Sequence, residues 1–241
     1  MEATTSIDTR TQVLDVIRQK AWYSYRPDGS FDWMDSVGQI ATALQLSPDT
    51  VRDAIESAFD GASLTTLSLE TDGNTTQISL IEALSKLDQE LYLWTVGDTA
   101  WQQKKMDNTG ASHFVDPNHI LNFTRDKIEG LRKVLDVIVE SRPVSNTKIH
   151  IIVVDDKRDN VDSVTSMTEE YSNKGIEIHT YHMKLNEPLA NAERCYTYIV
   201  DLVNRHSDDR TIILLDFDGV VANTDGVLFG KACDNIAQLL A

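Results

Sequence analysis

Residues 211–220 read TIILLDFDGV, and this stretch decides the fold of the chain. Its short run of β-branched residues and leucines is typical of a strand that is buried on both faces of a parallel sheet. The strand ends at Asp216 and Asp218, and alternate residues of an extended chain can converge on one point. Ligands of open α/β sheets gather beyond the carboxyl ends of the strands. Two carboxylates held there repel each other unless a cation or a proton lies between them.

The composition limits the class of protein. The chain has 241 residues and a formal net charge of −16, so it is long enough for one α/β domain with a small second unit. The negative charge argues against nucleic acid and anionic membrane surfaces as partners. The sequence contains no run of transmembrane length and begins without the apolar core of a signal peptide, so we expect a cytoplasmic protein. The composition leaves the oligomeric state open.

The first 62 residues are expected to be helical. Apolar residues recur at helical spacing over residues 10–25 and again over 33–46. Ser47 is the expected N-cap of a third helix, with Pro48 at its first helical position and an end near Gly61. Residues 63–75 are rich in Thr, Ser and Gly and are interpreted as a linker.

The rest of the chain alternates between strand and helix patterns. Strands are predicted at 90–95, 148–154, 176–181 and 211–216, with a short strand at 113–115 or 120–123. Helices are predicted at 79–87, 101–106, 124–140, 161–171, 188–206 and 229–240. Strands that alternate with helices indicate right-handed crossovers and therefore a mainly parallel sheet of an α/β fold.

Three predicted strands end in polar residues, namely at Thr95, at the pair Asp155-Asp156 and at Asp216. The carboxyl ends of parallel strands lie at one edge of the sheet, so these side chains are expected near one another. Lys127 lies in the first turn of a predicted helix, and a long loop before it is expected to bring it to the same edge.

These residue types suit phosphoryl transfer better than acyl transfer, because the set of candidate residues contains no serine with a histidine base. An aspartate can attack phosphorus to form an aspartyl phosphate, and Mg²⁺ prefers carboxylate and phosphate oxygens. Lysine and threonine can hold the oxygens of the phosphoryl group, while a second carboxyl group transfers protons. Taken singly, each residue also has a structural explanation, such as an aspartate that caps a helix or a lysine in solvent.

Together the motifs resemble those of the haloacid dehalogenase (HAD) superfamily of phosphatases and phosphotransferases. The family's first motif, Asp-x-Asp-x-Thr/Val after a strand, is similar to residues 216–220, DFDGV. Its second, a strand that ends in Ser or Thr, is similar to residues 91–95, LYLWT. Its third motif, a lysine near the start of a helix, is best matched by Lys127 in TRDKIEGL. Its fourth motif, a strand that ends in an acidic pair, is similar to residues 151–156, IIVVDD.

The resemblance implies a role for each matched residue. Asp216 would be the nucleophile and Asp218 the general acid and base. Thr95 and Lys127 would bind the phosphoryl oxygens, with Gly219 also at the substrate. The implied fold is a three-layer, Rossmann-like HAD core.

The resemblance also implies a Mg²⁺ site. Asp216, the backbone carbonyl of Asp218 and Asp156 would bind the ion, with Asp155 as a further candidate. The position of Asn160 often carries another acid in this family, and here the neighbouring acids are Asp159 and Asp162.

The order of the motifs departs from the family, because the first motif stands last in this chain. This is the order that a circular permutation produces, and such permutation is tolerated when termini are exposed and close together. Residues 1–65, with about 226–241, would form a small helical cap of the C1 type, and residues 76–225 the α/β core. A cap of this kind closes over small phosphorylated metabolites, so a small substrate is implied.

Two alternatives remain open at this point. The chain could be a HAD-like binding or regulatory protein without catalysis, although retention of Asp218 argues against it. The stretch IIVVDDKRDN, residues 151–160, also resembles the start of a two-component receiver domain. A receiver needs later strands that carry Ser/Thr and Lys, and too few residues follow Asp216 to supply both.

Overall fold

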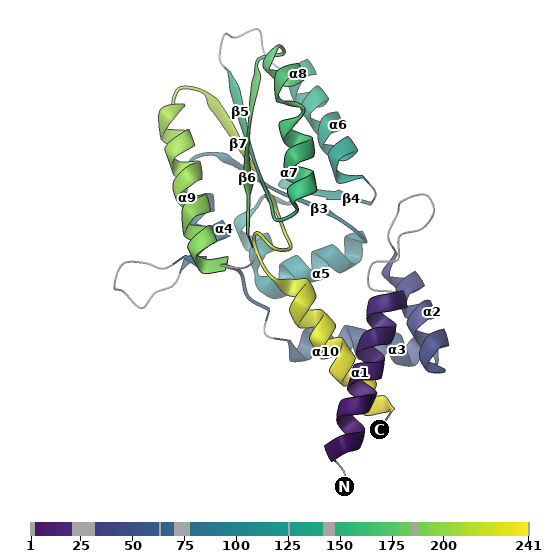
Figure 1. Ribbon diagram of the computed structural model, residues 1–241. Coiled ribbons are helices and arrows are strands. Elements are labelled where there is room, and N and C mark those ends of the chain that lie inside the picture. The colour runs from purple at the N-terminus through teal and green to yellow at the C-terminus, as the bar shows by residue number, and fades with distance from the viewer. Residues whose placement is uncertain are drawn as a thin grey trace.

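The chain folds around a parallel β-sheet with helices on both faces (Figure 1). The computed structural model describes residues 3–20, 32–62, 64–69, 78–124, 126–141, 148–184 and 188–240. The fold class is α/β with a three-layer, Rossmann-like arrangement, which confirms the prediction from the alternation of strands and helices.

The sheet has five strands in the order β4-β3-β7-β5-β6, and all neighbours are parallel. The strands are β3 (Glu90–Val96), β4 (Ile120–Phe123), β5 (Ile149–Asp155), β6 (Ile176–His182) and β7 (Arg210–Asp216). The last strand in the sequence, β7, therefore lies at the centre of the sheet. Of the two short strands considered, 120–123 is correct, because residues 111–114 form a 3-10 helix instead.

The helices of the core lie close to their predicted positions. They are α4 (Leu80–Ser85), α5 (Thr99–Thr109), α6 (Lys127–Glu140), α7 (Arg158–Thr165), α8 (Thr168–Ser172) and α9 (Pro188–Arg205), with 3-10 helices η1 (Ala111–Phe114) and η2 (Pro117–His119). The single helix expected over 161–171 is two helices, because the chain turns at Ser166 and Met167.

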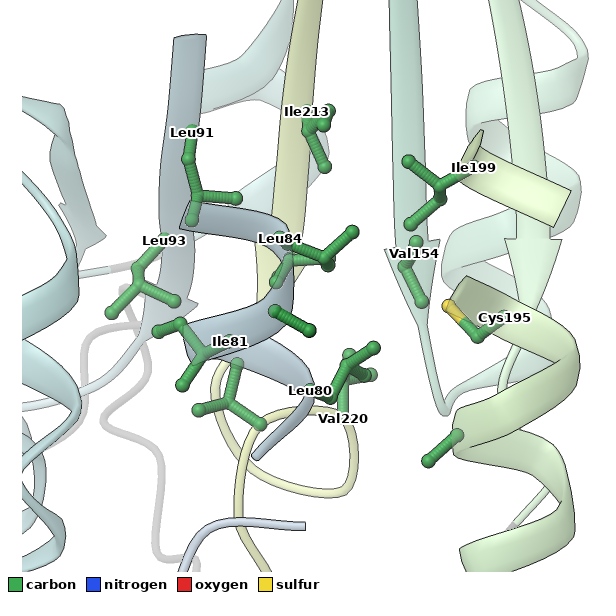
Figure 2. Close-up of a cluster of buried hydrophobic side chains, with 14 of the residues drawn as sticks. Leu80, Ile81, Leu84, Leu91, Leu93, Val154, Cys195, Ile199, Ile213 and Val220 are labelled. Atoms are coloured by element: carbon green, nitrogen blue, oxygen red, sulfur yellow. The ribbon is translucent and has the colours of Figure 1, made fainter. Parts of the chain in front are cut away.

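Alternate residues of the central strands belong to two different hydrophobic clusters. Figure 2 shows Val154 of β5 and Ile213 of β7 on the face covered by α4 and α9, where they pack near Leu84 and Ile199. The residues between them in sequence, such as Leu214, pack with α6, α7 and α8. All seven residues of β5 are buried, which explains why its apolar run is continuous and does not alternate with polar residues.

A second group of helices lies beyond the sheet. It consists of α1 (Ala3–Lys20), α2 (Trp33–Leu44), α3 (Pro48–Gly61) and α10 (Thr224–Leu239), which share one hydrophobic cluster. The Ser47 side chain accepts a hydrogen bond from the Thr50 N–H and Pro48 begins α3, as predicted. Helix α1 covers residues 10–20 of the first predicted helix, 10–25, and residues 21–31 lie outside the described residues.

The helical group contacts the core through α5. Trp101 of α5 stacks on Trp33 with ring centroids 5.1 Å apart and meets the ring of Phe59 edge-on at 4.8 Å. Part of the predicted linker, 63–75, is a strand instead: β1 (Ser68–Leu69) pairs antiparallel with β2 (Ile78–Ser79). Residues 63 and 70–75 of the predicted linker lie outside the described residues. Within the described part of the chain, the helices are too short or too polar to cross a bilayer.

Truncation of a side chain in the central strand should destabilise the whole core. Ile213 is fully buried between α4 and α9, so Ile213→Ala is expected to lower the free energy of unfolding by about 2–5 kcal/mol. Urea denaturation followed by circular dichroism measures the change. Val137→Ala is the matched control, because that side chain is 61% exposed; equal losses in the two variants would contradict the packing described here.

Candidate functional site

Two aspartates end the neighbouring central strands. Asp216 is the last residue of β7 and Asp155 the last of β5, and the pairing of Val154 with Leu215 brings the two ends side by side. Both are buried, with 6% of Asp216 and none of Asp155 exposed. The sequence prediction that these carboxylates meet at one edge of the sheet is confirmed.

Lys127 provides a buried positive charge between these two carboxylates. Its Nζ lies 2.8 Å from Asp155 Oδ2 and 2.7 Å from Asp216 Oδ1. The ammonium group also lies 4.0 Å from the ring centroid of Trp94, where the ring face attracts a cation. The expected long loop is wrong in detail, because η2 and β4 occupy that stretch. Since β4 ends at this edge, Lys127 reaches it as the first residue of α6.

Asp156 contributes a carboxylate with unused hydrogen-bonding capacity. Its Oδ1 is buried and accepts no hydrogen bond from the described residues. Its backbone oxygen lies 3.0 Å from His182 Nε2. Burial, and then the negative charge of Asp155, raise the pKa of Asp156. A buried oxygen without a donor is costly unless a cation or water approaches it.

Gly219 allows the Asp156 carboxyl group to approach the chain that follows β7. The backbone of Gly219 has φ +83°, and a Cβ built there would lie 2.5 Å from Asp156 Cγ. Hydrogen bonds hold this turn, including one of 2.8 Å from the Gly219 N–H to the Ala222 carbonyl and one of 3.0 Å from the Val221 N–H to the Phe217 carbonyl. The glycine of the DFDGV motif is therefore needed for close approach as well as for backbone conformation.

The Asp218 side chain has partners of its own. Lys105 of α5 forms an ion pair with Asp218 Oδ2, and the Thr224 hydroxyl donates to Asp218 Oδ1. Lys105 is only 1% exposed and Thr224 is fully buried. Both carboxylate oxygens of Asp218 thus have a partner, one from α5 and one from the start of α10.

The three remaining aspartates form a group that fits a hard divalent cation. Each of Asp155, Asp156 and Asp216 offers an oxygen, and these oxygens lie within 4.8 Å of one another. Burial raises the pKa of Asp216 to about 7, against the opposing effect of Lys127. Asp155 is fixed in place by Asn160 Nδ2 at 3.1 Å. Carboxylate oxygens held this closely, with one lacking a donor, match the ligands that Mg²⁺ takes.

Thr95 is brought to the same edge without contacting the carboxylates. It follows Trp94, whose Cα pairs with that of Asp216, and only 2% of it is exposed. Because Leu91 and Leu93 face α4 and α9, alternation along β3 directs Thr95 toward that side of the sheet. Its hydroxyl makes no hydrogen bond with any residue that the structure describes.

Sequence reasoning missed Lys105 and Thr224, and it named Asn160 without assigning it a contact with Asp155. Lys105 stands four residues after Trp101 in a helix, so both lie on the same buried face, and a lysine at such a position was an available signal. Asn160 lies in the first turn of α7 and donates to Asp155. Thr224 follows the DFDGV motif closely, but nothing in the sequence indicates that its side chain returns to Asp218.

Comparisons with known proteins do not place the chain in a family: no family model, curated protein or solved structure matches it. The fold and the site define an α/β protein with an acidic cluster and two buried lysines at the carboxyl edge of its sheet.

The raised pKa of Asp216 implies that the free energy of unfolding depends on pH. The folded protein holds this proton up to about pH 7, whereas the usual value is 3.8, so ionisation of Asp216 lowers the free energy of unfolding as pH rises through that interval. Asp216→Asn removes this cost. In EDTA, its free energy of unfolding should exceed that of the wild type by about 1–4 kcal/mol at pH 8, with the difference vanishing near pH 4.

Urea denaturation at a series of pH values measures this difference. Asp88→Asn, at an exposed position, is the control for loss of one negative charge. A difference between Asp216→Asn and wild type that stays constant from pH 4 to pH 8 would contradict the assignment.

A methyl group at Gly219 should disturb Asp156. Gly219→Ala places Cβ against the Asp156 carboxyl group at a positive φ, so we expect a loss of about 1–3 kcal/mol in stability and weaker Mg²⁺ binding in a calorimetric titration. Gly38→Ala is the matched control, since Cβ there meets no atom within 4 Å and alanine favours the helix. Equal behaviour of the two variants would show that the close approach is unimportant.

Proposed function

We propose that this protein is a Mg²⁺-dependent phosphatase that acts through an aspartyl phosphate on a small phosphorylated substrate. The observation that carries the proposal is the position of Lys127, whose ammonium group touches both Asp155 and Asp216. A buried lysine beside a strand-end aspartate offers a cation to phosphoryl oxygens at the place where a nucleophile stands. The resemblance of the motifs to the HAD superfamily supports the same assignment.

The first step is attack by an Asp216 oxygen on phosphorus, with cleavage of the bond between phosphorus and the leaving oxygen. Asp218 donates a proton to that oxygen as the bond breaks. In the second step Asp218 accepts a proton from water, whose oxygen attacks phosphorus and releases phosphate and the free Asp216 carboxylate. Lys105 and Thr224 hold the Asp218 carboxyl group in position for both transfers.

Asp156 and Asp216, supported by Asp155, are the residues that would hold the divalent cation. Bound there, Mg²⁺ would neutralise charge on the substrate phosphate and oppose the repulsion between that phosphate and the carboxylates. Lys127 lowers the same repulsion from the α6 side. Thr95, whose hydroxyl has no hydrogen bond with the described residues, is assigned to a phosphoryl oxygen.

The helical group is the proposed cap. α10 begins at Thr224, which binds Asp218, and α5 carries both Trp101 in the helical cluster and Lys105 in the site. Helices that start at the reacting groups can exclude water and leave room for a small substrate. On this proposal, residues 1–65 and about 226–241 select the substrate, and the motif order is that of a circular permutant.

Replacement of the nucleophile tests the mechanism. The wild-type protein with Mg²⁺ is assayed on a panel of phosphate esters, and Asp216→Asn is expected to lower kcat by about 10³-fold or more on any ester that is hydrolysed. Acid quenching during turnover should trap the phosphoryl group on the wild type and leave the variant unlabelled.

The control is Asp88→Asn, which should retain wild-type turnover. Retained turnover in Asp216→Asn would eliminate the proposed nucleophile. A wild-type protein that hydrolyses no ester would favour a regulatory HAD-like protein, and stable phosphorylation by a small phosphodonor without turnover would favour a receiver.

A further inference from the structure

A group of three histidines lies at the opposite edge of the sheet from the aspartates. His150 is the second residue of β5, His179 the fourth of β6, and His206 follows the last residue of α9. His150 and Asp155 are five residues apart in one strand, a distance of about 16 Å. The histidine cluster is therefore separate from the site described above.

The three imidazoles present nitrogen atoms to one another. His150 Nδ1 lies 3.1 Å from His179 Nε2, and one nitrogen from each of the three rings lies within 4.8 Å of the others. Ligand nitrogens about 2.0–2.1 Å from a tetrahedral Zn²⁺ are about 3.3 Å apart. The pair His150 and His179 already has this spacing, and the third nitrogen needs to move by at most about 1.5 Å to match it.

An aspartate fixes the orientation of the most buried ring. Only 1% of His150 is exposed, and its Nε2 lies 3.2 Å from Asp209 Oδ2. The other Asp209 oxygen accepts a hydrogen bond from the Lys148 N–H at 3.1 Å. With the Nε2 proton donated to Asp209, the lone pair of His150 Nδ1 points toward His179. A carboxylate behind a histidine in this way orients and strengthens metal-binding imidazoles.

Two carboxylates beside the cluster, those of Asp209 and Glu177, favour a bound cation. Glu177 Oε2 lies 3.6 Å from His150 Nδ1 and supplies a nearby negative charge. Neutral rings beside carboxylates are the form in which histidine binds metal ions.

A hydrogen bond from His179 to His150 explains only part of this arrangement. It accounts for the 3.1 Å contact but leaves the third ring without a role. His206 stacks on His150 with ring centroids 3.8 Å apart, and its nitrogens make no hydrogen bond with the described residues. A shared cation would give His206 a partner, provided that its ring turns away from the stack on His150, because a metal-bound imidazole directs its lone pair in the plane of the ring.

We propose that His150, His179 and His206 bind one Zn²⁺ ion, with Asp209 orienting His150 and a water or Glu177 in the fourth position. Imidazole nitrogens select borderline ions such as Zn²⁺ over Mg²⁺, which prefers oxygen. The ion would join β5, β6 and the end of α9, so it would stabilise this edge of the sheet. The site is independent of the proposed phosphatase chemistry.

The test uses untagged, chelator-dialysed full-length protein in excess Mg²⁺, which leaves oxygen sites occupied. Calorimetric titration with Zn²⁺ should give one equivalent bound and a rise of a few degrees or more in the melting temperature. His179→Asn and His206→Asn should each weaken Zn²⁺ binding about 100-fold or more, and Asp209→Asn about 10–100-fold.

Two controls separate this site from others. His113→Asn removes an exposed histidine, and Asp156→Asn alters the acidic site; neither should change Zn²⁺ affinity. Binding that survives the His179→Asn, His206→Asn double substitution, or that Asp156→Asn abolishes, would overturn the proposal. X-ray absorption of the wild type with Zn²⁺ avoids any folding defect of the variants: a shell with imidazole nitrogens supports the site, and an oxygen-only shell rejects it.

Discussion

The buried ammonium group of Lys127 is the interaction on which this edge of the molecule depends. Asp155 and Asp216 end adjacent strands that are hydrogen-bonded along their length, so the sheet itself forces the two carboxylates together. Their repulsion in a buried setting would be expensive without a cation between them. Lys127 supplies that cation at 2.8 Å and 2.7 Å and lies over the face of Trp94. The same contact ties α6 to the two central strands.

The aspartates at the end of β7 are held by partners from different helices. Asp216 and Asp155 are held from the α6 side, whereas Asp218 is held by Lys105 and Thr224 from the side of α5 and α10. The tight turn at Gly219 allows this division, because it carries the chain past Asp156 within a few residues. The two lysines are buried, at 1% and 6% exposure; Lys105 pairs with Asp218, and Lys127 pairs with both Asp155 and Asp216. The helix α10, which belongs to the separate helical group, therefore also positions a carboxylate of the site through Thr224.

Much of the fold could be predicted from local patterns. The apolar runs of β5 and β7, the Ser47-Pro48 start of α3 and the spacing of apolar residues in α6 each reflect interactions within a few residues, which a single sequence displays. The strand-end aspartates could also be predicted, since parallel strands bring their carboxyl ends together. The course of the chain before Lys127 could not be predicted, because it depended on whether residues 113–115 or 120–123 form the strand that precedes α6. Lys105 was missed because its partner lies 113 residues away.

By itself, the sequence determined the order of strands and helices, the two faces of each central strand and the group of carboxylates that must share an edge. These follow from periodicity and from the geometry of parallel pairing. Only the tertiary structure decided that β7 is central, that Lys105 and Thr224 hold Asp218, and that three histidines 29 and 27 residues apart meet. The physical reason is that such contacts depend on how distant elements pack, and no local pattern of residue types records that packing.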